Sequence, residues 1–319
     1  MPRISYVVTV YNKRPYLPFL LAGLVAQRGD FDREFIFVDD GSNDGSADVL
    51  RDLNRGRSNV SIIEQANQGP ARALNRGLLE ARGDLIKPMD ADDVLLPDAT
   101  AVLLEAMTST GQRLAFGDQA HYRTDVAGGP EAVIAQGPSP HGRIVDIPDA
   151  LQRTLRRAQT TPSAWLADAA VVRLARGCDP DVFVQDYSIE LRMARYTGFA
   201  KVEAPVFLAP ESAPGRLSEQ EAQTLHDINL AVCHFLRDLE HVTEESRRYA
   251  LARVLGRAWT WGRRHESGIA LLSAEFRHYA RTRLRLFPTG DALIDAACTT
   301  FRRTHPIRLP ATEATGAPF

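Results

Sequence analysis

Apolar runs and amphipathic segments alternate along the first 120 residues of the chain. The runs are typical of buried strands, whereas the segments between them place apolar residues at helical spacing. The predicted strands are residues 4–10, 34–40, 59–65, 84–90 and 113–118. The predicted helices are residues 16–27, 46–55, 69–82 and 97–109, with Ser42 or Asp44 as a cap of the second and Pro97 opening the last. This alternation predicts an α/β fold with a Rossmann-like, mixed but mostly parallel sheet that helices cover on both faces.

The pattern is less regular in the middle of the chain and changes again after residue 216. Residues 121–160 are rich in Gly, Pro and Asp, which indicates loop with an irregular edge strand. Residues 145–159 and 183–198 have helical patterns, and residues 200–211 form a final strand. Apolar residues then recur on one face of a long helix, and two or three further helices follow. We therefore predict an α/β domain at residues 1–216, a helical domain at 217–305 and a disordered tail at 306–319.

The composition is that of an ordinary soluble globular protein, with 44% hydrophobic and 24% charged residues. The net charge of -2 gives no global electrostatic argument for nucleic acid, so no such partner is expected. Cys178, Cys233 and Cys298 lie far apart without metal-ligand spacing, which favours a reducing compartment such as the cytoplasm. No apolar run reaches the ~18–20 residues of a membrane span, so a membrane contact would be peripheral.

Acidic residues cluster where the fourth predicted strand ends, in the segment LIKPMDADDVLLPD. On an ideal strand Asp90 and Asp92 point to the same face, and two carboxylates at the edge of a sheet repel each other. A divalent cation would remove the repulsion, and oxygen ligands suit Mg²⁺ or Mn²⁺. A solvated turn is the alternative. Asp98 has a separate explanation, because a carboxylate at a helix start is favoured by the helix dipole.

The first two predicted strands also end in polar residues. Thr9 and Tyr11 place a hydroxyl group and an aromatic ring after the first strand, and Asp39 and Asp40 follow the second. A strand-end acid can accept a hydrogen bond from a nucleobase or a ribose, although a turn with a helix cap would use the same residues. Ligands of parallel sheets bind at the carboxyl ends of the strands. The three strand ends together predict a crevice for a nucleoside diphosphate and a metal.

Four segments resemble, in their order and spacing, the inverting glycosyltransferases of family 2, which have the GT-A fold. They are VTVYNKRPYL, FVDDGSNDGS, NQGPARALNRGLLEARGDLIKPMDADD and FVQDYSIELRMARYTG, and the similarity spans residues 3–218. The resemblance implies transfer of a sugar from a nucleotide-sugar donor, with Mn²⁺ or Mg²⁺ at a DXD motif. The acceptor would be a hydroxyl group of a saccharide or a lipid-linked saccharide.

The resemblance also implies which residues bind the nucleotide. Thr9, Tyr11 and Asp40 would hold the nucleobase, which is usually uracil in this family. Arg72, in the segment ARALN, is a further candidate for the nucleotide.

Metal and base residues follow from the same resemblance. Asp90 would contact the ribose or the metal, and Asp92 would be the main metal ligand beside the diphosphate. Asp186 matches the general base that takes a proton from the acceptor hydroxyl, with a helix N-cap as the alternative role. Gln185 stands where the family typically has Glu, so one negative charge beside the base is missing.

Two further positions bear on the diphosphate and the acceptor. Many relatives place a His near the end of the catalytic domain, but this chain has none there, which leaves the third metal ligand open. Arg216 lies in that region and could bind the diphosphate or be an ordinary surface arginine. Trp165 falls in the segment where the family builds its acceptor site, and it could stack on a sugar ring or lie in the core.

Arginine is abundant toward the C-terminus. Residues 241–305 contain 12 Arg and no Lys against 6 acidic residues, and Trp259 and Trp261 lie among them. Such helices can lie on an anionic membrane, or bind an anionic lipid-linked acceptor or a partner chain. The alternative is a solvated helix face that packs on the catalytic domain, since the whole chain uses 35 Arg and only 3 Lys.

The prediction is therefore a glycosyltransferase of surface polysaccharide or glycoconjugate synthesis, located in the cytoplasm and in peripheral contact with the inner face of the membrane. Two other classes stay open. A non-catalytic carbohydrate-binding or scaffold protein with a transferase fold is disfavoured by the presence of Asp90, Asp92 and Asp186. A nucleotidyltransferase usually opens with a glycine-rich phosphate loop after its first strand, and YNKRPYL has no glycine.

Overall fold

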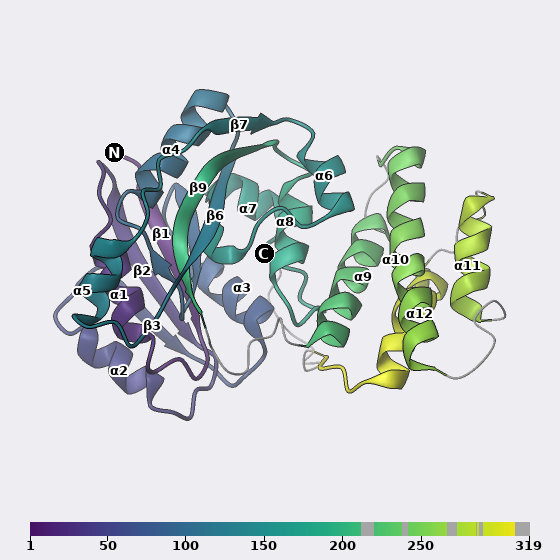
Figure 1. Ribbon diagram of the computed structural model, residues 1–319, viewed down its shortest axis with the longest axis horizontal. Coiled ribbons are helices and arrows are strands. Elements are labelled where there is room, and N and C mark those ends of the chain that lie inside the picture. Colours follow the sequence, from purple (N-terminus) through teal and green to yellow (C-terminus); the bar gives the residue numbers. More distant parts are fainter. Residues whose placement is uncertain (212–219, 238–241, 267–272, 285, 287–289, 310–319) are drawn as a thin grey trace.

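A mixed sheet of nine strands forms the centre of the part of the chain that the structure describes (Figure 1). The computed structural model describes residues 1–211, 220–237, 242–266, 273–284, 286 and 290–309. The strands are β1 (Arg3–Val10), β2 (Asp32–Asp39), β3 (Val60–Glu64), β4 (Leu85–Asp90), β5 (Val94–Leu95), β6 (Leu114–Tyr122), β7 (Ile144–Ile147), β8 (Trp165–Asp168) and β9 (Phe199–Pro210). Their order is β3-β2-β1-β4-β8-β6-β9-β5, and β7 pairs with β9.

The sheet has a parallel half and a mixed half. Strands β3, β2, β1 and β4 all run in the same direction. Strand β8 is antiparallel to both β4 and β6, whereas β9 is parallel to β6 and antiparallel to β5 and β7. The mixed Rossmann-like sheet is thereby confirmed, and its parallel half carries the three strand ends that the sequence singled out.

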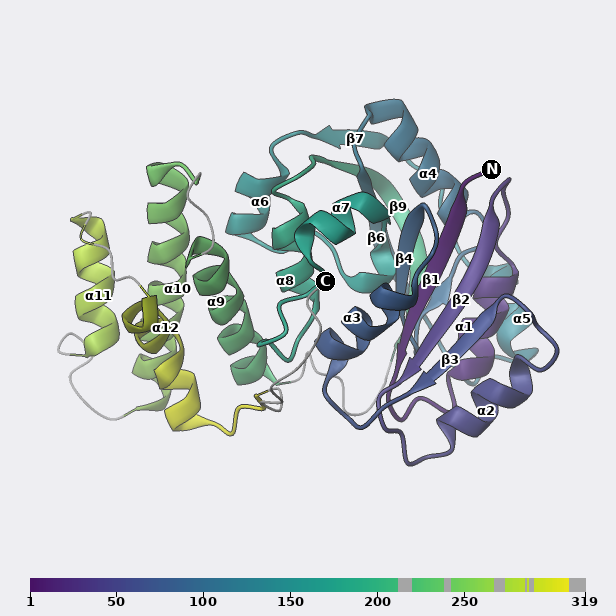
Figure 2. The same ribbon diagram turned by 180° about the vertical axis from the view of Figure 1, so that it is seen from behind.

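Helices cover both faces of the sheet (Figures 1 and 2). In the described part of the chain they are α1 (Leu17–Val25), α2 (Ser46–Leu53), α3 (Pro70–Glu80), α4 (Ala99–Thr110), α5 (Gly129–Gln136), α6 (Ala150–Arg156), the short 3₁₀ helix η1 (Pro162–Ala164), α7 (Ala169–Ala175), α8 (Asp186–Met193), α9 (Glu221–Arg237), α10 (Glu244–His265), α11 (Ala274–Arg283) and α12 (Gly290–Thr304). Helices α1 and α4 pack on one face, and α3, α7 and α8 pack on the other.

Successive side chains of β1 point to opposite faces of the sheet and contribute to a separate hydrophobic core on each face. Tyr6 and Val8 are buried against α1 and α4, and Val7 between them is buried against α3. Gly77 lets α3 come close to the sheet, because a Cβ atom at this position would lie 2.4 Å from Cγ1 of Val7. This close packing holds the loop before α3 at the carboxyl edge of β1 and β2.

Helices α9 to α12 lie together beside the α/β body (Figure 1). The core on the α3 face continues into them through buried residues such as Leu230, Leu255 and Cys298. The side-chain amide of Asn229 on α9 donates to Val254 O at 3.0 Å and to Ala297 O at 2.7 Å, which ties α9 to α10 and α12. No described helix is both long enough and apolar enough to cross a membrane.

Several local predictions differ from the structure. Residues 144–147 form the edge strand β7 instead of the start of a helix, and α6 begins only at Ala150. Asp98 lies at the N-cap of α4 but makes no capping hydrogen bond, and its Oδ2 atom is 3.5 Å from Nη1 of Arg28. The N-cap of α2 is Gly45 instead of Ser42 or Asp44, although Asp44 accepts a hydrogen bond from the backbone N–H of Ser46 at 2.9 Å. Residues 212–219 and 310–319 lie outside the described residues, so the boundary at 216/217 and the tail beyond residue 309 stay predictions. Within the predicted tail, the backbone N–H of Arg308 donates to Oε1 of Gln223 at 2.7 Å and its carbonyl accepts from Nε2 of Gln223 at 3.0 Å.

Candidate active site

The carboxyl ends of β1, β2 and β4 meet at one edge of the sheet. Thr9 lies opposite Asp90 in the pairing of β1 with β4, and Val10 lies opposite Asp39 in the pairing of β1 with β2. The backbone N–H of Asp40 donates to Val10 O at 2.8 Å. Three of the residues predicted for the nucleotide crevice, which come from distant segments of the sequence, are therefore neighbours along this edge.

The loop after β1 is held by the loop after β2. Asn12 has φ 52°, its backbone N–H donates to Oγ of Ser42 at 2.9 Å, and its Oδ1 accepts from the backbone N–H of Asn43 at 2.9 Å. Asn is one of the few residues that tolerate this left-handed conformation. Tyr11, next to this turn, keeps 45% of its surface exposed. Its ring is thus accessible to a planar ligand at the sheet edge.

Asp40 fixes the loop that precedes α3. Its Oδ1 accepts from Nε2 of Gln65 at 2.7 Å and from the backbone N–H of Gln68 at 2.9 Å, and its Oδ2 accepts from the backbone N–H of Gly69 at 2.8 Å. Burial raises the pKa of the Asp40 carboxyl. Among the described residues, Oδ2 of the neighbouring Asp39 is buried without a hydrogen-bond partner. The sequence could not separate these two acids, and the nucleobase role of Asp40 stays a prediction.

Four carboxyl groups gather at the end of β4 and the start of α8. Burial raises the pKa of Asp90 well above its usual value, and the charges of Asp93, Asp186 and Asp92 raise it further. Two lysines oppose them among the described residues: Nζ of Lys13 lies 2.6 Å from Oδ2 of Asp92, and the buried Lys87 interacts electrostatically with Asp93 and Asp90. Two lysines do not balance four acids, and clustered carboxylate oxygens are the ligands that Mg²⁺ and Mn²⁺ prefer. The set of donor atoms therefore fits a divalent cation.

Hydrogen bonds hold this acidic segment in place. The backbone N–H of Asp90 donates to Oγ of Ser163 at 2.9 Å, and Nε2 of Gln185 donates to Oδ1 of Asp90 at 3.3 Å. The hydroxyl group of Tyr122 donates to Asp92 O at 2.9 Å. Strand β4 ends at Asp90, so Asp92 lies in the following turn and the strand alternation used in the sequence argument does not extend to it.

Asp186 is the first residue of α8. Burial raises the pKa of its carboxyl from 3.8 to about 6. Its charge contributes to the raised pKa of Asp90, so the predicted base and the predicted metal ligands share one site. Oε1 of the adjacent Gln185 is buried without a partner among the described residues. Because Nε2 of Gln185 donates to Asp90, this side chain joins the start of α8 to Asp90 without adding a further negative charge.

Helix α9 anchors the segment that leads into Asp186. Oδ2 of Asp227 accepts from the backbone N–H groups of Phe183 at 3.0 Å and Val184 at 2.9 Å. Nδ1 of His226 lies 2.7 Å from Oδ1 of Asp227, and Nε of Arg302 on α12 donates to Nε2 of His226 at 2.9 Å. Both His226 and Asp227 are buried. Sequence reasoning missed this anchor; the only signal was an adjacent acid and histidine in an otherwise apolar helical face.

A second acid and a lysine hold the segment before β8. Glu190 accepts from the backbone N–H groups of Gln159 at 2.8 Å and Thr160 at 3.2 Å, and burial raises the pKa of its carboxyl to about 7. Lys87 is fully buried on β4 and donates to Ser163 O at 2.6 Å, and burial lowers the pKa of its amine to about 7. The sequence did not reveal either role. Trp165 is 1% exposed in the core, so its ring faces cannot stack on a sugar.

The remaining predicted residues lie elsewhere. Nε of Arg72 on α3 donates to Pro180 O at 3.2 Å, which joins α3 to the segment before α8. Arg216 lies outside the described residues. A separate group, Asp179, Asp181 and His234, brings three ligand-type side chains together, and Nδ1 of His234 lies 2.7 Å from Oδ2 of Asp179. These contacts again join α9 to the segment that precedes the base.

Comparison with known proteins agrees with this arrangement. Residues 5–161 match the model of glycosyl transferase family 2. Undecaprenyl-phosphate 4-deoxy-4-formamido-L-arabinose transferase of Aeromonas hydrophila is 36% identical over 107 residues, which cover 32% of this chain and 33% of the relative. The chain spans about a third of the length of the first curated relatives that it matches.

Two solved structures share the fold over nearly the whole chain. Staphylococcus aureus TarS 1-349 in complex with UDP-GlcNAc is 14% identical, with 94% of this chain and 90% of that chain covered and a TM-score of 0.62. The mannosyltransferase PcManGT from Pyrobaculum calidifontis, in complex with GDP-Man and Mn²⁺, is 16% identical, with 95% and 88% covered and a TM-score of 0.56. The fold is therefore GT-A. With the match of residues 5–161, the strand-end acids and this fold taken together, the α/β body of the chain is identified as a glycosyl transferase family 2 domain.

Proposed function

We propose that the protein transfers a sugar from a nucleotide-sugar donor, a UDP-sugar, to an acceptor hydroxyl with inversion of the anomeric configuration. The observation that carries this proposal is the convergence of Asp90, Asp92, Asp93 and Asp186 at the carboxyl edge of the parallel strands. Three of these acids would hold a cation beside the diphosphate, and the fourth has the raised pKa of a general base.

The donor would lie along the ends of β1, β2 and β4. Thr9, Tyr11 and Asp40 would contact the nucleobase, with Asp39 as a further candidate because of its unpartnered buried oxygen. Arg72 and Arg216 stay candidates for the nucleotide and its diphosphate. The structural neighbours that hold UDP-GlcNAc or GDP-Man support a nucleotide-sugar donor for the same fold.

A divalent cation, Mn²⁺ or Mg²⁺, would be held by Asp92 and Asp90. When bound it would stabilise the negative charge that develops on the leaving diphosphate. Lys13 supplies a second positive charge beside Asp92, from the loop that follows β1. Mn²⁺ in the Pyrobaculum calidifontis structure supports the proposed metal.

Asp186 would act as the general base. Its carboxylate takes the proton of the acceptor hydroxyl while that oxygen attacks the anomeric carbon from the face opposite the diphosphate. One C–O bond forms as the bond to the diphosphate oxygen breaks, which inverts the anomeric centre. A carboxyl with a pKa of about 6 is a stronger base than an ordinary aspartate and is still mostly ionised at neutral pH.

The acceptor would be a saccharide or a lipid-linked saccharide of surface polysaccharide or glycoconjugate synthesis. The relative whose name includes undecaprenyl-phosphate supports a lipid-linked acceptor. We place the protein in the cytoplasm, with residues 1–216 as the catalytic domain. The Arg-rich helices of residues 217–305 would provide the peripheral contact with the inner face of the membrane.

A thermal-shift screen of UDP-, GDP- and dTDP-sugars, each with and without Mn²⁺, tests the core of the proposal. A bound ligand raises the melting temperature by mass action, so we expect a shift that requires both a UDP-sugar and Mn²⁺. Asp92→Asn should abolish this shift, whereas Asp48→Asn, which removes an exposed acid from α2, should leave it unchanged. A product with retained anomeric configuration in an NMR assay of transfer would contradict inversion. If no nucleotide sugar binds, a non-catalytic protein becomes the better account.

A further inference from the structure

Residues of α10 line most of a groove of about 420 Å³. This helix lies away from the strand ends of the candidate active site (Figure 1). Ala252, Gly256 and Thr260 contribute from α10 itself, Leu225 from α9 and Tyr279 from α11. The groove is open at Gly256, because a Cβ atom there would have only Tyr279 within 4 Å, at 3.5 Å. The volume lies in the range of small-molecule sites.

Three arginines line this groove. Arg253, Arg257 and Arg264 are spaced by four and seven residues, so they lie on the same face of α10. The helical rise places the first two about 6 Å apart along the axis and the third about 10 Å further on. The acids of α10, Glu244 and Glu245, are in its first turn, so no carboxylate of this helix lies within the groove.

None of the three guanidinium groups is paired with a carboxylate among the residues that the structure describes. Nη1 of Arg253 makes a long contact of 3.5 Å with the hydroxyl group of Tyr249. Nε of Arg257 is buried without any partner in the described ranges. Burial lowers the pKa of the Arg257 guanidinium, and the positive charge of Arg253 acts in the same direction. Arginine nevertheless stays protonated, so this largely buried positive charge has no carboxylate partner in the part of the chain that the structure describes.

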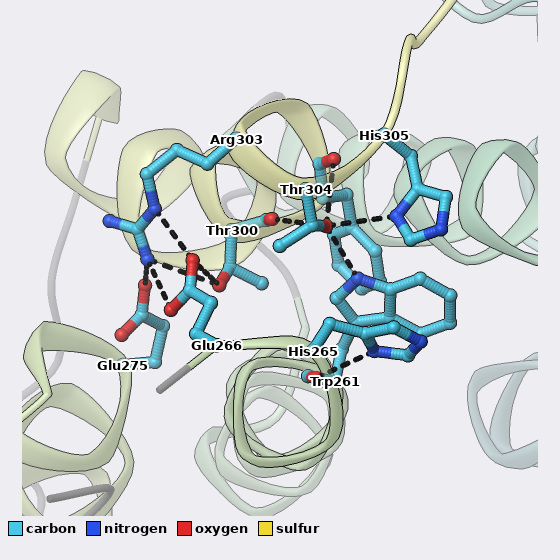
Figure 3. A network of polar contacts seen from close by, with 9 residues as sticks. Trp261, His265, Glu266, Glu275, Thr300, Arg303, Thr304 and His305 are labelled. Carbon is cyan, nitrogen blue, oxygen red and sulfur yellow. Dashed lines mark hydrogen bonds and ion pairs between the residues drawn. The ribbon is translucent and has the colours of Figure 1, made fainter. Parts of the chain in front are cut away.

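Arginines in the same helical region can be fully paired, as Figure 3 shows. Arg303 on α12 donates to Glu266 at 2.9 and 3.0 Å and to Glu275 at 3.0 Å. Arginines of the α/β body pair in the same way, for example Arg143 with Glu203. Among the described residues, the groove arginines therefore lack the carboxylate partners that Arg303 and Arg143 have.

We propose that this groove binds a phosphate-bearing ligand, with Arg253, Arg257 and Arg264 as its anion-binding groups. Guanidinium groups match phosphate oxygens with paired hydrogen bonds, and such bonds are stronger where water is excluded. The spacing of the three groups fits a diphosphate or a chain of several phosphates better than one carboxylate, which a single arginine can satisfy. The source can be a soluble phosphate ester or the headgroup of an anionic lipid, because both present the same chemistry.

Isothermal titration calorimetry with inorganic diphosphate tests the proposal on the full chain. EDTA is present throughout, so that the metal-dependent crevice does not contribute. We expect Arg257→Gln and Arg253→Gln to raise the dissociation constant at least about tenfold, because each removes a charge-assisted contact. Arg248→Gln removes an exposed positive charge from the same helix outside the groove and should change it less than about twofold.

Gly256→Leu gives an independent variant, since it fills the groove without changing any charge. It should weaken diphosphate binding as much as Arg257→Gln. A circular-dichroism melt of each variant shows whether the helices stay folded. The proposal is overturned if the groove variants bind like the wild type, or if Arg248→Gln weakens binding as much as they do.

Co-sedimentation with vesicles distinguishes the two sources. Vesicles of phosphatidylglycerol and phosphatidylcholine are compared with vesicles of phosphatidylcholine alone. If only the anionic vesicles bind, and Arg257→Gln and Gly256→Leu both abolish this binding, the ligand is a lipid headgroup. If diphosphate alone binds through the groove, the ligand is a soluble phosphate ester. If neither binds to the wild type, or if Arg248→Gln reduces vesicle binding equally, the groove is not a phosphate site.

Discussion

Replacing Asp186 with Asn should stabilise the protein and at the same time slow sugar transfer. Burial raises the pKa of this carboxyl from 3.8 to about 6. Ionised Asp186 therefore destabilises the folded state relative to the unfolded chain, in which the carboxylate is hydrated. Two pKa units correspond to about 3 kcal/mol. The side chain keeps some contact with water, so this figure is an upper limit. Asn has nearly the same shape and no charge to bury.

The pH dependence has a definite sign. A buried carboxyl with a raised folded-state pKa costs the folded protein least when it is protonated, at low pH. The free energy of unfolding of the wild type therefore falls as pH rises from about 4 through about 6. The stability gain of Asp186→Asn should therefore be near zero at pH 4 and reach up to about 3 kcal/mol at pH 8. Urea unfolding of both proteins in EDTA measures this difference. Asp149→Asn, at the exposed start of α6, is the matched control and should show no such trend.

Transfer should fall by a factor of about 10² to 10⁴ in Asp186→Asn, the usual contribution of a general base. The thermal shift with nucleotide sugar and Mn²⁺ should persist, because the base does not hold the donor. A variant that is less stable than the wild type at pH 8, or whose stability gain does not change with pH, would refute the argument from burial. Unchanged transfer would show that Asp186 is not the base.

Three other substitutions test the packing and the charges around the site. Gly77→Ala should destabilise by about 1–3 kcal/mol despite its better helix propensity, because the added Cβ would lie 2.4 Å from Cγ1 of Val7; chemical denaturation checks this. Burial lowers the pKa of the Lys87 amine to about 7, so between about pH 7 and pH 10 the folded protein binds fewer protons than the unfolded chain. The stability of the wild type should therefore rise with pH in this window, and Lys87→Met should remove that rise. An unchanged pH profile of unfolding would contradict this. The raised pKa of Glu190 means that its ionised carboxyl destabilises the fold, so the stability of the wild type should fall between about pH 4.5 and pH 7. Glu190→Gln should abolish this fall. A stability profile of the variant that still falls would show that another group is responsible.

The sequence predicted the elements that depend on local pattern. Apolar runs of 5 to 8 residues located β1 to β4, and the rule that ligands bind at the carboxyl ends of parallel strands brought Thr9, Asp40 and Asp90 to one edge. Asp186 was found only through the resemblance to a known family, because nothing in its local pattern distinguishes a base from a helix cap. Its role and those of the nucleotide residues stay predictions.

The contacts that the sequence could not reveal join distant segments. Lys13 is 79 positions from Asp92, with which it forms an ion pair, and a lysine in a loop has no pattern that would indicate this partner. The burial of Lys87 was equally hidden, because a charged residue within an apolar strand is expected to point toward solvent. In both cases the partner is determined by how strands and loops meet in three dimensions. The antiparallel insertion of β8 between β4 and β6 has the same origin, since strand order is not encoded in a local pattern.

The bond from Asp227 to the Phe183 and Val184 amides limits how modular this chain can be. If the C-terminal helices were exchanged for those of a relative, two N–H groups just before the proposed base, one buried and one partly buried, would lose their acceptor unless the incoming helix carried an acid at the same place. Each unsatisfied amide costs about 1–3 kcal/mol. Chimeras and truncations that end before α9 should therefore show weak protection of these two amides in hydrogen exchange. In such hybrids, substitutions at residues 183–184 and 226–227 would therefore have to be made as a set.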